Sequence, residues 1–254
     1  MTRVTKIGGN ELNAPGFLAE LAGVHHELTW LGGGAVIVHG GGQEIATMQT
    51  RLGIEPVKVD GLRVTDAASL DVAEMVLSGR ANKQIVRALL AGGLDAVGLS
   101  GVDGRLLTAR QKQHPTADLG LVGEVTAVRL TLLERLLQMG IVPVISPISL
   151  GDDGQTYNVN ADEAAAAIAA ALGADTLDFV SNVPGVLAGG KLVPHLSPAA
   201  AEALIADGTI AGGMIPKVRA ALDALARGVA SVRIVDLAGL RGNRGTVFSE
   251  SVGQ

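Results

Sequence analysis

The sequence predicts an α/β protein whose central sheet is mainly parallel and is covered by helices on both faces. Short, largely apolar runs occupy residues 35–39, 95–99, 141–145 and 176–180. Strands of this kind are typical of the buried middle of a parallel sheet. Longer segments rich in alanine and leucine separate these runs, as helices separate the strands of βαβ units.

Taken in chain order, the elements alternate as this fold class requires. The opening residues MTRVTKIGG read as a first strand rather than as a targeting leader. Helices are expected over residues 13–31, 43–53, 67–92, 130–139, 161–172, 197–207 and 215–227. Gly79 is expected to break the third of these, residues 67–92.

Three turn-rich stretches interrupt this alternation. They surround Asp60-Gly61, Asp103-Gly104 and residues 151–154, and each predicts a hairpin. Such hairpins either form lids over a cleft or simply decorate the surface.

Composition limits the possible functions. The chain has 254 residues, of which 48% are hydrophobic, with a net charge of -5, one Trp, one Tyr and three Phe. An acidic chain with so few aromatic rings is a poor candidate for nucleic-acid binding. It has no cysteine, and its longest apolar run, residues 164–174, is shorter than the ~20 residues of a membrane span. We therefore expect a soluble cytoplasmic protein. If the chain forms two lobes, we expect the break between them near Gly173, after the alanine-rich helix.

Two segments each place one lysine beside two glycines at the edge of a predicted element. They are KIGG at residues 6–9 and GGMIPKV at residues 212–218. Pro216 suits the first turn of a helix, and the following Lys217 is a cation at the end where the helix dipole disfavours one. Either an anionic ligand binds there or the lysine is solvated. Together the two segments suggest a two-lysine phosphoryl-transfer site.

Two glycine-rich segments need separate interpretations. Residues 38–42, VHGGG, lead from a strand into a helix, where backbone amides could bind phosphate or carboxylate, although a tight turn also requires glycine. No G-x-G-x-x-G match starts there, which disfavours a dinucleotide site. Residues 185–191 fit a P-loop except that Leu192 replaces its Ser or Thr, so we interpret the match as a chance resemblance within a hairpin.

Polar side chains on two further segments could hold a small acid. Arg63, on a predicted hairpin arm, could clamp a carboxylate, or it could be solvated. Asn158, Asn160 and Asp162 precede a helix, where they could cap it, face a cleft, or do both. The five histidines show no metal-ligand spacing, so no dedicated metal site is expected.

Taken together, these motifs resemble the amino-acid kinase family. The resemblance extends almost from end to end, through segments that are specific in combination and in this order. They are residues 6–9 (KIGG), 38–42 (VHGGG), 60–66 (DGLRVTD), 98–101 (GLSG), 118–124 (DLGLVGE), 157–162 (YNVNAD), 182–185 (NVPG) and 212–217 (GGMIPK).

The resemblance implies a single domain, residues 1–254, with an open three-layer αβα sandwich. Its N-terminal lobe, residues 1–173, would hold N-acetyl-L-glutamate, and its C-terminal lobe, residues 174–254, would hold ATP with Mg²⁺ carried by the nucleotide. As a phosphotransferase with a carboxyl group as acceptor, the protein would make N-acetyl-L-glutamyl 5-phosphate for arginine biosynthesis. A carboxylate acceptor is already ionised at neutral pH, so aligning and neutralising charge would suffice for catalysis.

The resemblance also assigns roles to individual residues. Catalytic residues would be Lys6 and Lys217, which stabilise the transferred group, and Asp162, which orients them. Substrate would contact Gly41, Gly42, Arg63 and Asn158, and phosphate or nucleotide would contact Gly8, Gly9, Asn182, Gly185 and Gly213. Asn182 stands where the family commonly has aspartate.

The same resemblance leaves two alternative functions open and implies an oligomeric state. The acceptor could instead be aminoadipate or glutamate on a carrier protein in lysine biosynthesis, or the chain could be a non-catalytic regulator that binds an amino acid. Retention of Lys6, Asp162 and Lys217 disfavours the regulator. The immediate first strand and the tail at residues 242–246 favour an arginine-insensitive homodimer over a hexameric ring.

Overall fold

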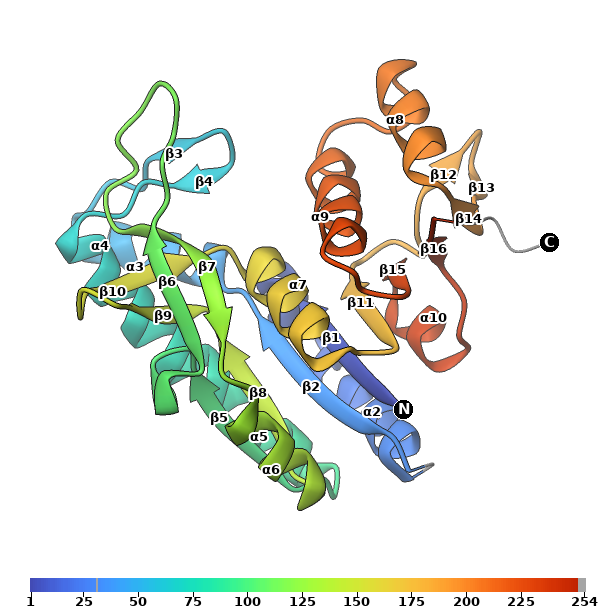
Figure 1. Cartoon of the computed structure of the whole chain (residues 1–254), viewed down its shortest axis with the longest axis horizontal. Helices are drawn as coiled ribbons and strands as arrows, with labels where there is room; N and C mark the ends of the chain where they lie inside the picture. The colour runs from blue at the N-terminus through green and yellow to red at the C-terminus, as the bar shows by residue number, and fades with distance from the viewer. Residues whose placement is uncertain (31, 251–254) are drawn as a thin grey trace.

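The computed structural model describes residues 1–30 and 32–250. Its central sheet has eight strands in the order β14-β16-β15-β11-β1-β2-β8-β5 (Figure 1). In that order they are His195–Leu196, Thr246–Phe248, Val232–Val235, Thr176–Val180, Thr2–Ile7, Gly34–His39, Val142–Ser146 and Ala96–Ser100. Every pairing is parallel except that of β15 with β16, which confirms the mainly parallel sheet.

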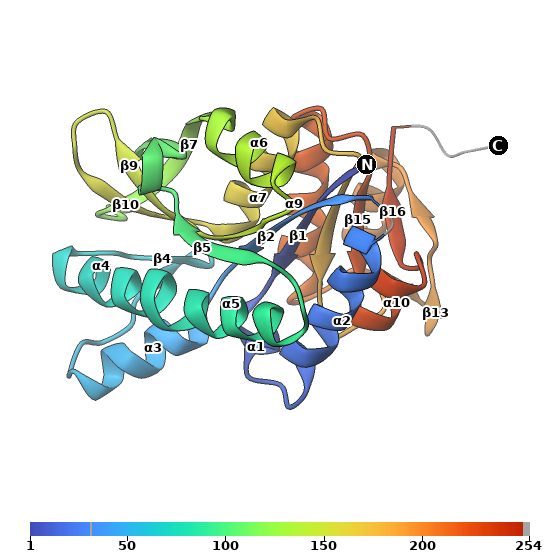
Figure 2. The same cartoon turned by 90° about the horizontal axis from the view of Figure 1, so that it is seen from below.

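Helices cover both faces of this sheet, so the three-layer αβα sandwich is confirmed (Figure 2). On one face lie α6 (Leu130–Gln138), α7 (Ala161–Leu172), α8 (Pro198–Ala206) and α9 (Met214–Ala226). On the other lie α2 (Phe17–Trp30), α5 (Asn82–Ala91) and α10 (Leu237–Arg241). Side chains alternate along each strand, so neighbouring positions such as Val36 and Ile37 enter different cores.

Helix α7 lies over the middle of the sheet, against β1 and β2. Its residues 164–169 are all buried, and five of the six are alanine. Small side chains let the helix backbone approach the sheet closely, which fixes its position along the strands. The helix ends at Gly173, whose φ of +57° is the left-handed conformation that glycine adopts at a helix C-terminus.

A smaller unit stands beside the carboxyl edge of the sheet. Four strands pair into a closed barrel: β6 (Leu107–Gln111), β7 (Val122–Val128), β9 (Ile148–Gly151) and β10 (Thr156–Val159). The hairpin β3 (Lys58–Val59) and β4 (Leu62–Arg63) lies next to the loop between β6 and β7 (Figure 1). Backbone bonds join the two, since Thr65 N–H donates to the Leu119 carbonyl at 3.0 Å.

Most of the expected elements are confirmed, including the hairpins at residues 60–61 and 151–154. The segment 185–192 forms the hairpin of β12 (Leu187–Ala188) and β13 (Lys191–Leu192), as expected. The expected helix 13–31 begins later, at Phe17, and its last position, Leu31, lies outside the described residues. The expected helix 43–53 is α3 (Gly42–Arg51).

Two expectations were wrong. Gly79 does not break its helix, because α4 (Ala67–Glu74) continues through a π-helical segment, Met75–Ala81, into α5. Buried Val76 and Leu77 anchor that segment, which outweighs the ~1 kcal/mol that a helical glycine costs relative to alanine. Residues 103–104 form a 3₁₀ turn instead of a hairpin, because β6 pairs with β7 and β9 and not with β5.

Two short helices were not anticipated, α1 (Gly9–Leu12) and α10. Among the helices of the described residues, none has both the length and the apolar character that crossing a membrane demands.

Candidate active site

A cavity of about 230 Å³ opens at the carboxyl edge of the sheet, beyond the ends of β1, β2 and β8. Parallel strands bring their carboxyl ends to one edge, and this is where α/β folds place ligands. Eight of the twelve predicted site residues line the cavity: Lys6, Gly8, Gly9, Gly41, Gly42, Arg63, Asn158 and Asp162. The other four, Lys217, Asn182, Gly185 and Gly213, lie outside its lining, in the last third of the chain.

Main chain forms the floor of this cavity. The turn after β1 packs against the turn after β2 so closely that a Cβ on Gly9 would lie 2.9 Å from the Cα of Gly41. A Cβ on Gly41 would meet the Leu77 side chain at 2.6 Å. Close approach therefore favours glycine at these positions, as the turn interpretation of VHGGG held. Gly41 is also the N-cap of α3. Because glycine has no side chain, the first helical amides receive no side-chain cap there.

Lys6 and Asp162 form an ion pair at the cavity wall. The Lys6 Nζ lies 2.7 Å from Asp162 Oδ1, and the two side chains are 15% and 24% exposed. Lys6 extends from β1 toward α7, whose first turn carries Asp162. The pair is shielded but reachable, so the ammonium is fixed in direction and still able to face an anion.

Lys217 enters the same region from the first turn of α9. Its ammonium donates to the hydroxyl of Ser181, the residue that follows β11. Burial lowers the pKa of Lys217, the nearby Glu11 carboxylate opposes this, Lys6 lowers the pKa further, and Asp162 raises it. The positive charge of Lys6 disfavours the charged form of Lys217, and a nearby anion favours it.

Arg63 is a buried cation that forms no ion pair with any residue that the structure describes. Its Nη1 donates to Gln49 Oε1 at 2.5 Å and its Nη2 to the Gly42 carbonyl at 2.6 Å. Burial lowers its pKa. Within residues 1–30 and 32–250, none of the ion pairs involves Arg63. The cavity that it lines is thus prepared for a carboxylate.

The asparagines before α7 divide their tasks. Asn160 Oδ1 caps the helix, accepting from the backbone amides of Asp162 at 2.8 Å and Glu163 at 3.3 Å. Asn158, on β10, donates to the Thr65 hydroxyl at 3.2 Å and lines the cavity beside Arg63. Both interpretations of the segment, capping and facing a cleft, are therefore found in it.

The remaining predicted residues occupy turns of the C-terminal third. Asn182 Oδ1 accepts from the Ser181 hydroxyl at 3.4 Å. Gly213 is the N-cap of α9, again without a capping side chain. Gly185 has φ +148°, and a Cβ there would lie 2.6 Å from Thr246 Oγ1, so close packing accounts for this glycine.

Sequence reasoning missed several contributors. Gln49 lies on the buried side of α3, four residues after Ile45, where the helical pattern calls for an apolar residue. That misplaced polar residue was a usable signal, since Gln49 is what orients Arg63. Ser181 could have been found as the polar residue that ends a buried strand. Glu11, whose carboxylate acts on Lys217, gave no local signal.

In the described part of the chain, no group of three or more His, Cys, Asp or Glu side chains is placed to hold a metal ion. His39 is not available as a ligand either. It is buried at the end of β2, with Nδ1 donating to the Gly40 carbonyl at 3.0 Å and Nε2 accepting from Asn82 at 3.2 Å. Burial lowers its pKa to about 4.

A parallel αβα sheet that gathers two lysines, an aspartate and amide-rich glycine turns at its carboxyl edge defines a phosphotransferase that acts on a small anionic acceptor. Comparison with known proteins identifies the family. The model of the amino acid kinase family matches residues 1–236, and the chain belongs to that family.

Individual relatives cover nearly the whole chain. It is 53% identical to the acetylglutamate kinase of Roseiflexus sp. (strain RS-1) over 249 residues, which is 98% of this chain and 94% of the relative. It is 50% identical to the acetylglutamate kinase of Geobacillus kaustophilus (strain HTA426) over 236 residues, 92% of this chain and 89% of that one.

Solved structures share the fold. A protein from Streptococcus mutans UA159 superposes with a TM-score of 0.85 at 28% identity, covering 98% of this chain and 99% of that one. An N-acetylglutamate synthase from Neisseria gonorrhoeae, complexed with coenzyme A and N-acetyl-glutamate, gives 0.86 at 27% identity. That match covers 99% of this chain and 60% of the synthase.

Proposed function

We propose that this protein transfers the γ-phosphoryl group of ATP to the side-chain carboxylate of N-acetyl-L-glutamate, giving N-acetyl-L-glutamyl 5-phosphate in arginine biosynthesis. The observation that carries this proposal is the arrangement of charge along one cavity. Buried Arg63, which lacks a counterion among the described residues, lies at one part of the lining, and the Lys6–Asp162 pair lies at another. The relatives named acetylglutamate kinase supply the acceptor's identity.

The reaction needs no general base. An oxygen of the acceptor carboxylate forms a bond to the γ-phosphorus as the bond from that phosphorus to the bridging oxygen of ADP breaks, and the electron pair leaves with ADP. Charge on the phosphoryl oxygens is what requires stabilisation. Lys6 and Lys217 supply it, and Asp162 orients them. Arg63 and Asn158 hold the acceptor, while the amides at Gly41 and Gly42 bind its oxygens.

The nucleotide occupies the C-terminal lobe in this proposal. Residues 1–173 form the lobe for the amino acid and residues 174–254 the lobe for ATP. The nucleotide contacts the turns at Asn182, Gly185 and Gly213, and also Gly8 and Gly9. Mg²⁺ would be carried by the nucleotide and held mainly by phosphate oxygens and water, and when bound it would further neutralise phosphate charge.

The protein's setting completes the proposal. We expect a cytoplasmic homodimer. The relatives do not support the carrier-bound acceptor or the non-catalytic regulator.

The test is magnesium-dependent ADP release with N-acetyl-L-glutamate, with unacetylated glutamate and without acceptor, with hydroxylamine present to trap the acyl phosphate. We expect hydroxamate only with the acetylated acid, abolished by EDTA and by Lys217→Ala. Failure of the wild-type protein to form hydroxamate from N-acetyl-L-glutamate would refute the proposal. Activity retained in Lys217→Ala would refute the role of that lysine alone.

A further inference from the structure

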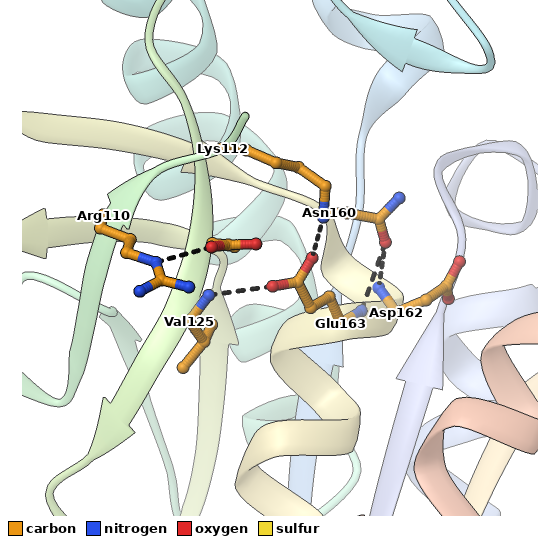
Figure 3. Close-up of polar contacts among 7 residues, drawn as sticks. Arg110, Lys112, Val125, Asn160, Asp162 and Glu163 are labelled. Carbon is orange, nitrogen blue, oxygen red and sulfur yellow. Dashed lines mark hydrogen bonds and ion pairs between the residues drawn. The ribbon is translucent and has the colours of Figure 1, made fainter. Parts of the chain in front are cut away.

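Glu163, in the first turn of α7, binds both arms of the β6–β7 hairpin (Figure 3). One carboxylate oxygen, Oε2, lies 2.9 Å from the ammonium of Lys112. The other, Oε1, accepts the backbone N–H of Val125 at 2.9 Å. Lys112 directly follows β6 and Val125 lies within β7, so one side chain binds both arms of the β6–β7 hairpin.

The neighbouring residue on the same helical turn belongs to the active site. Successive helical residues point about 100° apart, since there are about 3.6 residues per turn. Asp162 accordingly contacts Lys6 on β1 while Glu163 contacts the hairpin. Asn160 caps both of their amides. This turn is therefore held from the sheet side, from the hairpin side and by its own cap.

The ion pair between Glu163 and Lys112 is largely shielded from solvent, so it can restrict the orientation of both side chains. The Glu163 side chain is 14% exposed and that of Lys112 27%. A nearby pair, Arg110 with Glu124, is shorter at 2.6 Å but leaves Arg110 73% exposed, and it stays within the hairpin. Exposed pairs of that kind contribute little, whereas a shielded carboxylate with two partners resists rotation.

The pairing between β6 and β7 shifts next to Val125. Thr108 is opposite Ala127 and Ala109 is opposite Val125, so one residue of β7 is skipped at that point. An irregularity of this kind frees backbone groups from the ladder. Beside this shift the Val125 N–H donates to Glu163, which connects this part of the hairpin to the first turn of α7.

We propose that Glu163 is a positioning residue for phosphoryl transfer: by binding Lys112 and the Val125 amide it fixes the first turn of α7, and so sets where Asp162 holds Lys6. The inference rests on the proposed kinase activity. The same hairpin is bonded to the segment after Arg63, through Thr65 and Leu119. Glu163 thus links Lys6 to the part of the site that receives the acceptor.

The test compares graded substitutions at Glu163 with a matched control on the same hairpin. Glu163→Ala removes both contacts, Glu163→Gln keeps an acceptor for the Val125 amide and loses the charge opposite Lys112, and Lys112→Met removes the pair from the other side. Arg110→Gln removes an ion pair of the same hairpin that does not involve α7. For each variant we would measure kcat, both KM values and the thermal unfolding midpoint.

We expect kcat of Glu163→Ala to fall about 10- to 100-fold, because a displacement of about 1 Å at a reacting group costs about 100-fold. Glu163→Gln should fall between Glu163→Ala and wild type. The KM values should change much less than kcat, and Arg110→Gln should behave as wild type. A purely structural role would instead lower the unfolding midpoint and leave kcat of the folded fraction unchanged, and this result would overturn the inference.

A readout that does not need catalysis separates this inference from the proposed function. Hydrogen exchange of the amides in residues 161–166 should accelerate in Glu163→Ala and not in Arg110→Gln. Exchange unchanged in Glu163→Ala would overturn the inference even if the wild-type enzyme were active. A wild-type protein silent toward N-acetyl-L-glutamate would instead overturn the proposed function, and exchange would still decide whether Glu163 fixes the turn.

Discussion

Replacing Arg63 by lysine tests the acceptor site most directly. The guanidinium uses one nitrogen for Gln49 and another for the Gly42 carbonyl, and it can still present N–H groups to a carboxylate. A lysine ammonium keeps the charge but is a single point donor, so it cannot hold both protein partners and a two-pronged acid. Losing one charge-assisted hydrogen bond to the acceptor costs about 1.5–3 kcal/mol. At about 1.4 kcal/mol per factor of ten, that is about a 10- to 150-fold loss in kcat/KM for N-acetyl-L-glutamate.

The assay is initial rate of hydroxamate formation against acceptor concentration at saturating ATP. Most of the loss should appear as a higher KM for the acceptor, with the KM for ATP nearly unchanged. Arg129→Lys is the control, since the Arg129 guanidinium also donates to a carbonyl, that of Gly104 at 3.0 Å, and is exposed outside the cavity. An acceptor KM that is unchanged in Arg63→Lys, or raised equally in Arg129→Lys, would refute the assignment of Arg63.

Three further predictions concern catalysis, acid stability and packing. Lys6→Met should lower kcat by about 100- to 1000-fold with little change in the acceptor KM, as loss of one oxyanion-stabilising group does, and steady-state kinetics on a variant of wild-type melting temperature would check this. Burial lowers the pKa of both His25 and His39 to about 4. Between that value and about 6.5 the unfolded state binds protons that the native state excludes. The unfolding free energy should therefore fall as pH drops from about 6.5 to about 4, by at most about 3 kcal/mol per histidine. Urea titrations across that range would show the slope, and a flat profile would contradict it. Gly41→Ala should lower the unfolding free energy by about 1–3 kcal/mol through its clash with Leu77, measurable by the same titration, and a neutral result would mean that the Leu77 side chain simply moves aside.

Much of the fold could be predicted because its signals are local. Apolar strands and periodic helices identify themselves within a window of a few residues, as residues 176–180 and 161–172 did. Gly79 misled because its local cost is small beside the burial of Val76 and Leu77, which depends on tertiary packing. The four-residue helix α1 was missed because its segment, GNEL, is too short to show a period.

The candidate site could be predicted in part for the same reason. Residues at the ends of parallel strands share an edge, so the motifs at Lys6 and Gly41 converge by topology alone. Gln49 and Glu163 act through partners 14 and 51 positions away in sequence, Arg63 and Lys112. Such pairings follow from how hairpins and helices come together in space. The polar Gln49 on the buried side of its helix marks that position as unusual, but nothing near either residue in the sequence identifies its partner.

The close contact between Gly9 and Gly41 limits how the acceptor preference of this protein can change. The peptide groups of these two turns offer the same donors whatever side chains surround them, and a Cβ at Gly9 would clash with the backbone of Gly41. Variation in the acid that is accepted can come instead from lining side chains such as Lys58 and Leu62, which belong to the short β3–β4 hairpin. Libraries aimed at new carboxylate acceptors should vary these two positions, keep Arg63 and leave the glycine turns intact.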